Sequence, residues 1–260
     1  MELIDTHCHL DYDFAPKTQA EIVKEALDAG VSQLITIATD VPSLEKMAKI
    51  SALYPMVFHT LGIHPHDSKT LEDSHLEQIK KAATHPRCLG IGEIGLDYHY
   101  DHSPREVQKT VLKKQLDLAL EVRLPIVIHS RDAEEDLLIL LSAYVRGLPK
   151  GAVPGVIHCF TGTKGFGEAC LALGFYISFS GILTFKKAED LHKAAHAFPL
   201  ERLVVETDAP FLAPIPFRGQ KCEPSMVKLT AQKLAEIKGV SLTEVARVTT
   251  ENAKRLFGLG

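Results

Sequence analysis

Two histidines lie one residue apart near the N-terminus, directly after a short apolar run. The stretch LIDTHCHLDYD spans residues 3–13 and places His7 and His9 at alternate positions. On an extended strand, alternate side chains point to the same side, so the two imidazoles could bind one metal ion. They could equally be ordinary polar residues at the mouth of a loop. The choice between these interpretations depends on whether the rest of the chain supplies further ligands.

Other side chains of metal-ligand type follow short apolar runs further along the chain. They are His64, Glu93, His129, His158, Glu206 and Asp208. Imidazole suits zinc and other transition metals, whereas carboxylates suit harder ions such as magnesium and manganese. The set is larger than one tetrahedral zinc ion needs. It suits two ions that share a bridging carboxylate, a centre that can activate water and hold the reacting oxygens of a phosphoryl displacement.

Each of these residues, taken alone, also has an ordinary structural explanation. A lone histidine at a strand end is usually a hydrogen-bonded surface residue, and Asp208 could cap a helix or a turn. Glu93, in GIGEIGLD, is harder to explain, because burying a carboxylate among apolar residues is costly without a cation or hydrogen bonds. The glycines around it fit the close approach of a ligand or tight backbone packing. A metal site is therefore predicted only if these residues meet at one place.

Four neighbouring residues have less specific roles. Asp5, two residues before His7, is expected to be a hydrogen-bonding partner, and Cys8 is expected to pack in the core because alternation turns it away from the histidines. Arg131 and Arg218 could bind phosphate oxygens, since guanidinium offers a planar fork of donors. An exposed salt bridge is the ordinary role of either arginine.

The elements that could bring the candidate ligands together are short strands alternating with amphipathic helices. The strand-like runs are rich in β-branched residues and mostly apolar on both faces, as buried parallel strands are. They lie at 2–5, 33–39, 57–64, 88–94, 125–129, 155–160, 175–180 and 202–208. The pattern predicts an α/β fold, a (β/α)8 TIM barrel with residues 1–260 as a single domain. A doubly wound sheet is the alternative, but it usually has a glycine-rich phosphate loop after its first strand, and none follows here.

Helical patterns fill the intervals between these strands. In 20–30, the expected apolar stripe is Ile22, Val23, Ala26 and Leu27, and Gly30 is placed to end the helix. A longer helix is expected over 104–122, started by a proline. Helices over 223–239 and 241–258 should cover the last part of the barrel and one of its ends. In such a barrel all strands end on the same face, where the candidate ligands would meet.

Composition limits the class of protein. The chain has 260 residues, of which 45% are hydrophobic and 24% charged, as is usual for globular proteins. Its net charge of −4 argues against coating long stretches of nucleic acid, so any such contact would be local, such as one strand end in a pocket. Five scattered cysteines indicate neither a disulfide framework nor a cysteine zinc site. With no membrane-spanning stretch and no secretory signal, a cytoplasmic location is expected.

Seven motifs together resemble the TatD family of metal-dependent deoxyribonucleases, within the amidohydrolase-like barrel superfamily. The resemblance covers essentially the whole chain. The motifs are DTHCHLD at 5–11, GIHPHD at 62–67, IGEIGLDY at 91–98, HSRDA at 129–133, HCFTG at 158–162, ETDAP at 206–210 and PFRG at 216–219. The chain departs from the pattern of the family just after the last motif. Relatives commonly have RNEP where this chain has KCEP, with Cys222 in the asparagine position. That change lies outside the ligand set.

The resemblance implies a role for most of the candidate residues. One divalent ion would be bound by His7, His9, Glu93 and Asp208. The second would be bound by Glu93, His129 and His158, so that Glu93 bridges the pair. His64 matches a position beside the substrate that helps to bind phosphate, and Glu206 matches the acidic residue paired with the final aspartate. The implied activity is removal of nucleotides from DNA, often from a 3′ end, in repair or degradation.

These observations lead to an expected reaction with two rivals. We expect phosphodiester hydrolysis with two divalent ions (Mg, Mn, Zn or Ni), with Asp208 as general base and Glu206 as the reserve candidate. The expected substrate is DNA as single strands or strand ends, and the expected state is a monomer or weak oligomer with no membrane contact. The first rival is hydrolysis of an ester, lactone or amide, including the ester of a D-aminoacyl-tRNA. The second rival is a binding protein without catalytic activity.

Overall fold

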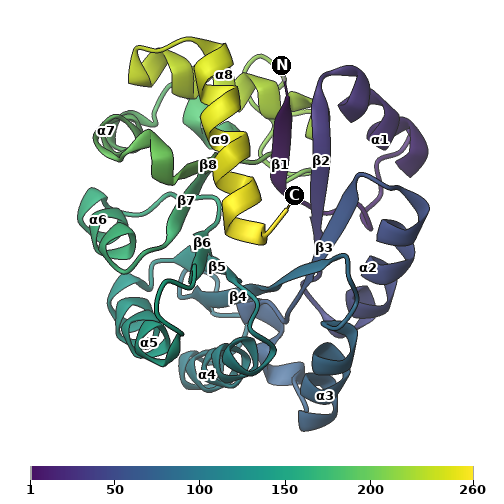
Figure 1. The fold of residues 1–260 in the computed structure, drawn as a ribbon, viewed down its shortest axis with the longest axis vertical. Helices are drawn as coiled ribbons and strands as arrows, with labels where there is room; N and C mark the ends of the chain where they lie inside the picture. Colours follow the sequence, from purple (N-terminus) through teal and green to yellow (C-terminus); the bar gives the residue numbers. More distant parts are fainter. Residues whose placement is uncertain (1, 260) are drawn as a thin grey trace.

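The computed structural model describes residues 2–259, and eight parallel strands in this part of the chain form one barrel-like sheet (Figure 1). Each strand pairs with the next in chain order, as the sequence predicts. The strands are β1 (Leu3–Cys8), β2 (Val31–Ile37), β3 (Val57–Leu61), β4 (Cys88–Asp97), β5 (Ile126–Arg131), β6 (Gly155–Ile157), β7 (Tyr176–Phe179) and β8 (Leu203–Val205). This order confirms the (β/α)8 fold and excludes the doubly wound sheet, in which the strand order reverses.

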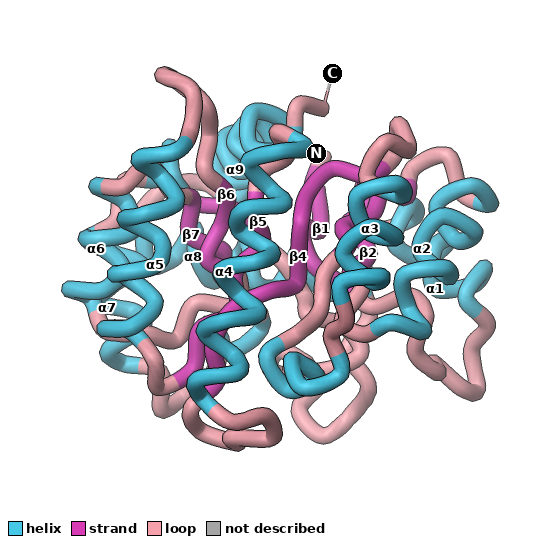
Figure 2. Tube along the Cα trace, turned by 90° about the horizontal axis from the view of Figure 1, so that it is seen from below, coloured by secondary structure: helices cyan, strands magenta, loops and turns pink. Residues whose placement is uncertain are grey.

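Helices surround the strands on the outside of the barrel, and the last of them lies across one end (Figures 1 and 2). They are α1 (Gln19–Asp28), α2 (Val41–Leu53), α3 (Asp73–Ala82), α4 (Arg105–Val122), α5 (Glu134–Gly147), α6 (Lys164–Ala172), α7 (Glu189–Ala197), α8 (Val227–Lys238) and α9 (Leu242–Phe257). In α1, a capping box between Thr18 and Glu21 starts the helix. Gly30 follows its end with φ 91°, a conformation that favours glycine.

Two expectations about the elements are wrong in detail. Leu27 does not belong to the buried stripe of α1, because 51% of its side chain is exposed while Ile22, Val23 and Ala26 are buried. Four strands are also shorter than expected, since β3 ends at Leu61, β6 ends at Ile157, β7 spans only Tyr176–Phe179, and β8 ends at Val205. His158, Glu206 and Asp208 therefore lie just beyond strand ends. There the backbone leaves the ladder and is free to aim side chains inward.

Strand β4 contains a bulge at the position of Glu93. Ile91 pairs with Ile126 and Ile94 with Ile128, so two residues of β4 face one residue of β5. A bulge of this kind changes the direction of a side chain. The backbone is so close to β5 there that a Cβ on Gly92 would lie 2.6 Å from the Cβ of Val127. Glycine before Glu93 is thus required by packing.

The barrel closes at its mouth through the residues that follow β8. The N–H of Asp208 donates to the carbonyl of His7 at 2.9 Å, and the N–H of His9 donates to the carbonyl of Ala209 at 2.7 Å. These bonds join the start of the chain to its last strand. They also place three candidate ligands on the two sides of one seam.

The opposite end of the barrel is covered by α9, as expected from the sequence (Figure 1). Leu256 and Phe257 of α9 belong to one apolar cluster with side chains from the strands. These are Ile4, Ile35, Ile37, Leu89, Val127, Val156, Tyr176 and Val204. The apolar core thus fills this end, and the polar residues gather at the other. Within residues 2–259, no helix has the length and apolar character needed to cross a membrane.

Phe257→Ala tests the contribution of this cover. Phe257 is 5% exposed, so its truncation leaves a cavity under α9 and should lower the free energy of unfolding by about 3–5 kcal/mol. Urea denaturation followed by circular dichroism measures the change. Leu53→Ala, at a position 68% exposed on α2, should change it by less than about 0.5 kcal/mol. Equal effects of the two substitutions would contradict the packing role of Phe257.

Candidate metal centre

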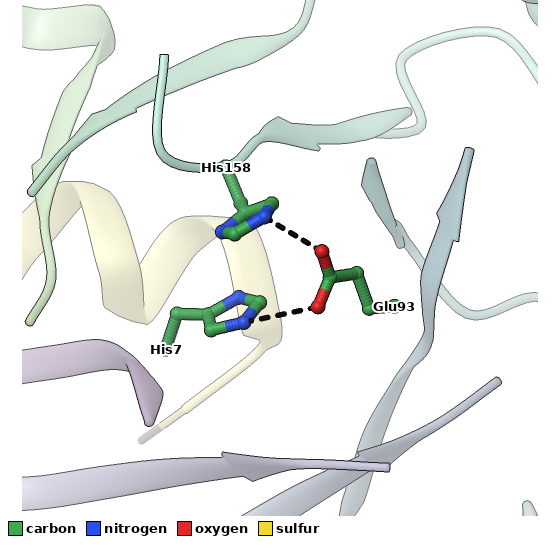
Figure 3. Close-up of side chains that lie close together, drawn as sticks. All are labelled: His7, Glu93 and His158. Carbon is green, nitrogen blue, oxygen red and sulfur yellow. Dashed lines mark ion pairs between the residues drawn. The ribbon is translucent and has the colours of Figure 1, made fainter. Parts of the chain in front are cut away.

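Six side chains from five strand ends converge at the mouth of the barrel. They are His7, His9, Glu93, His129, His158 and Asp208. Figure 3 shows three of them, with one carboxylate oxygen of Glu93 facing the imidazole of His7 and the other facing that of His158. The structure therefore brings together all six residues that the sequence analysis named as ligands.

The two oxygens of Glu93 face different partners. Oε2 lies 3.4 Å from Nε2 of His7. Oε1 lies 2.8 Å from Nε2 of His158 and 3.0 Å from Nδ1 of His129. One carboxylate thus lies between two sets of imidazoles, which is the arrangement that a bridging ligand requires.

Asp208 completes the set on the side of β1. Its Oδ1 lies 3.4 Å from Nε2 of His9 and 3.6 Å from Nε2 of His7. The side chain of Asp208 is 13% exposed, so it reaches both the buried histidines and the solvent. Asp208 has φ 61°, which turns the chain sharply after β8.

The site is strongly polarised because so many ionisable groups are buried together. Burial by itself would raise the pKa of Glu93, but His158, His64 and the hydrogen bond with His129 hold it well below its ordinary value. Burial would lower the pKa of His158, yet Glu93 and Glu206 raise it well above the ordinary value. Glu93 is therefore an anion that is compensated by surrounding cations.

His7 gives the test of whether a metal ion fits. Its ring is fully buried, and neither Nδ1 nor Nε2 has a hydrogen-bond partner. Burial, together with His158 stacked at a ring distance of 3.9 Å, lowers the pKa of His7. A neutral imidazole with a bare nitrogen between two carboxylates is a ready ligand for a divalent cation. The residues present therefore fit a metal centre.

Glu206 lies behind the ligands. Its side chain is buried, and its Oε1 lies 3.1 Å from Nδ1 of His158, on the side of the ring away from Glu93. It does not line the cavity described below. A carboxylate in this position fixes the orientation of the imidazole and increases its basicity.

Asp97 and His66 belong to the site, although the sequence analysis assigned no role to either residue. Oδ2 of Asp97 lies 3.0 Å from Nε2 of His129 and 3.0 Å from Nε2 of His66. Asp97 is 1% exposed, and the hydrogen bonds with the two histidines outweigh its burial and lower its pKa. Asp97 lies four residues after Glu93 on β4, and side chains an even number of residues apart on a strand share a face. This spacing could have identified Asp97 as part of the site.

Asp5 joins the two segments of the seam, as its expected structural role implies. Its carboxylate accepts hydrogen bonds from the N–H and the hydroxyl of Thr207, at 2.9 and 2.5 Å, and from the N–H of His7 at 3.3 Å. Burial raises the pKa of Asp5 to about 8.

Cys8 is fully buried in the core, as expected. Cys222 is also buried, and its N–H donates to the carbonyl of Pro210 at 2.9 Å, beside the turn that follows Asp208.

A cavity of about 480 Å³ opens over the converging side chains. His64 lines it, with Nε2 3.5 Å from Oε1 of Glu93, and Arg131 lines it from the end of β5. Tyr12, Tyr100 and Phe211 also line it, and the sequence analysis did not single them out. Arg218 is not among the lining residues, and its guanidinium lies 3.8 Å from the ring centre of Phe185.

Asp97→Asn tests the support of His129. The amide has the same shape but no charge, so it should weaken divalent-metal affinity roughly 10- to 100-fold. Titration calorimetry with Mn²⁺ on metal-free protein measures the affinity. Asp117→Asn, on the exposed side of α4, serves as the control and should leave it unchanged. An unaltered affinity in Asp97→Asn would show that Asp97 does not support a ligand.

The comparisons with known proteins agree with this geometry. The family described as TatD related DNase matches residues 4–258. The chain is 40% identical to an uncharacterised metal-dependent hydrolase, YabD, of Bacillus subtilis over 98% of both chains. It is 34% identical to the 3′-5′ ssDNA/RNA exonuclease TatD of Escherichia fergusonii over 94% of both. The crystal structure of YjjV, a TatD homologue of Escherichia coli, superposes with a TM-score of 0.91 at 30% identity, over 99% of this chain and 98% of that one. The chain belongs to the TatD related DNase family.

Proposed function

We propose that this protein is a hydrolase of phosphodiester bonds in DNA that uses two divalent metal ions. The observation that carries the proposal is the carboxylate of Glu93, one oxygen of which faces His7 while the other faces His129 and His158. Residues 1–260 act as a single hydrolase domain, as a monomer or weak oligomer. The family and the names of the relatives, metal-dependent hydrolase and exonuclease, support this reaction.

Each ion has its own ligands in this proposal. His7, His9, Glu93 and Asp208 bind the first, and Glu93, His129 and His158 bind the second. The positions of the ligand atoms support both sets. The atoms of His7, His9 and Asp208 lie within 4.8 Å of one another. Oε1 of Glu93 lies 3.0 Å from Nδ1 of His129 and 2.8 Å from Nε2 of His158. When bound, such a pair lowers the pKa of water towards neutrality and stabilises charge on the phosphoryl oxygens. Mg, Mn, Zn and Ni are all compatible with this mixture of imidazole and carboxylate.

Asp208 is the general base in this proposal. It lines the cavity, and His9 and His7 keep its pKa below the ordinary value in spite of burial. Its carboxylate is thus ionised and accessible to a proton from water. Glu206 is buried behind His158, so its role is to hold that imidazole in position rather than to accept the proton.

In this proposal the metal centre holds the substrate, and few other charged side chains contribute. His64 and Arg131 line the cavity and bind the phosphate next to the bond that is cut. Arg218 lies outside the lining, so a contact with the strand would lie beyond the cavity. The net charge of −4 fits a short contact with a strand end. Together with the name of a relative, 3′-5′ ssDNA/RNA exonuclease, it supports the proposed 3′-5′ removal of nucleotides from single strands, in cytoplasmic repair or degradation of DNA.

Digestion of end-labelled single-stranded DNA is the direct test. Metal-free protein should be inactive and should regain activity with Mg²⁺ or Mn²⁺. A 5′ label should yield a ladder of shortened strands, whereas a 3′ label should be released as mononucleotide at once. A panel of esters, lactones and D-aminoacyl-tRNA is assayed in parallel. Turnover of a panel member with no cleavage of DNA would reject the nuclease proposal in favour of a different hydrolase.

Glu93→Gln should abolish DNA cleavage and lower the metal content. The amide retains the shape of the side chain but removes the charge that both ions share, so we expect a loss of at least about 1000-fold in kcat/KM. Elemental analysis measures the metal, and a thermal melt verifies the fold. Glu135→Gln, exposed on α5, is the matched control and should retain metal and activity. Metal content equal to wild type in Glu93→Gln would refute the bridging role.

A further inference from the structure

The exposed aromatic side chains gather at one place on the molecule. Within residues 2–259 the most exposed are Tyr12, Tyr100 and Phe211, with 43, 54 and 45% exposed. The other phenylalanines and tyrosines in this range are buried or half-buried. All three exposed rings line the cavity over the metal centre. Phenylalanine is among the most often buried residues, so its exposure at this position calls for a ligand that covers it.

Tyr12 and Phe211 form a pair at the edge of the metal centre. Their ring centres lie 5.4 Å apart with the planes at 78°. The ring of His9 lies 5.4 Å from that of Tyr12 and 6.0 Å from that of Phe211. Because His9 is a ligand in the proposed centre, the pair adjoins the position of the phosphate that is attacked.

The backbone holds both rings close to the ligands. The N–H of Tyr12 donates to the carbonyl of His9 at 3.2 Å, and the N–H of Phe211 donates to the carbonyl of Asp208 at 2.9 Å. Each aromatic residue therefore lies three residues after a proposed ligand, and its N–H closes a tight turn on the carbonyl of that ligand. The hydrogen bond from the N–H of Cys222 to the carbonyl of Pro210 supports the turn between Asp208 and Phe211. The backbone of both aromatic residues is thus held in place before any ligand arrives, which reduces the entropy cost of binding.

The chemistry of the cavity determines what such a pair can bind. A nucleic-acid strand has charged phosphates and planar bases, and this chain has no basic excess with which to grip several phosphates. Contact with a base must then supply part of the affinity. Stacking on an aromatic ring does so with any of the bases, because each has a π-face.

We propose that Phe211, braced by Tyr12, is the platform on which an unpaired nucleobase next to the scissile phosphate stacks. This inference rests on the proposed nuclease function and adds the contact that selects the substrate. A base inside a duplex is already stacked and paired, so it reaches Phe211 only after it is unpaired. The platform therefore makes the enzyme prefer single strands and strand ends.

Removal of a single base from the substrate tests the platform. A normal 5′-labelled single strand is compared with two strands that carry a tetrahydrofuran abasic residue. In one the abasic residue is at the 3′-terminal position, and in the other it is at the penultimate position. Phe211→Ala should lower kcat/KM on the normal strand roughly 10-fold, or ~1.4 kcal/mol, mainly through KM. On the strand whose abasic position matches the platform, Phe211→Ala and wild type should agree within about twofold. Phe211→Trp should restore cleavage of the normal strand, because it keeps an aromatic face.

Two controls separate stacking from damage to the site. Metal content is measured in every variant, since Phe211 shares a turn with Asp208. Ile139→Ala, at a position 67% exposed on α5 and away from the cavity lining, should behave as wild type on all strands. An equal loss on normal and abasic strands, or no loss on either, would overturn the platform and leave the nuclease function intact. Wild-type protein that cleaves no strand at all would overturn both proposals.

Discussion

A buried carboxylate is the constraint on which the rest of the structure depends. Glu93 is 3% exposed, and an anion at that depth is stable only with compensating charge around it. His129 and His158, whose pKa is raised, supply that charge, and His7 and His64 surround the carboxylate from two further segments. Because those segments are distant in the chain, the compensation exists only when the barrel is closed. Fold and site are therefore formed together.

The convergence of the six candidate ligands could be predicted from the sequence because strand ends in a barrel share one face. Each of the six proposed ligands follows or ends an apolar run, and that position alone brings His9 and Asp208 together. The bulge in β4 is different, because its register depends on how β4 and β5 pack. Asp97 was given no role for a related reason, since its partners His129 and His66 come from other segments. Contacts between segments, rather than local patterns, decide such details.

Two layers of side chains divide the work at the mouth of the barrel. The inner layer faces the cavity, and the outer layer holds the inner one in place. Glu206 fixes His158, Asp97 fixes His129, and Asp5 ties Thr207 to the segment of His7. Each of these three carboxylates is buried, so each has a fixed geometry. The two acidic residues of the ETDAP motif, Glu206 and Asp208, thus have different roles in the proposed centre.

The seam between β1 and the segment after β8 has a consequence for the timing of activity. During synthesis on the ribosome, a chain that has emerged only as far as α7 contains five of the proposed ligands but lacks Asp208 and the strand that closes the circle. The six side chains can therefore converge only after β8 and the segment that follows it have been made and have joined β1.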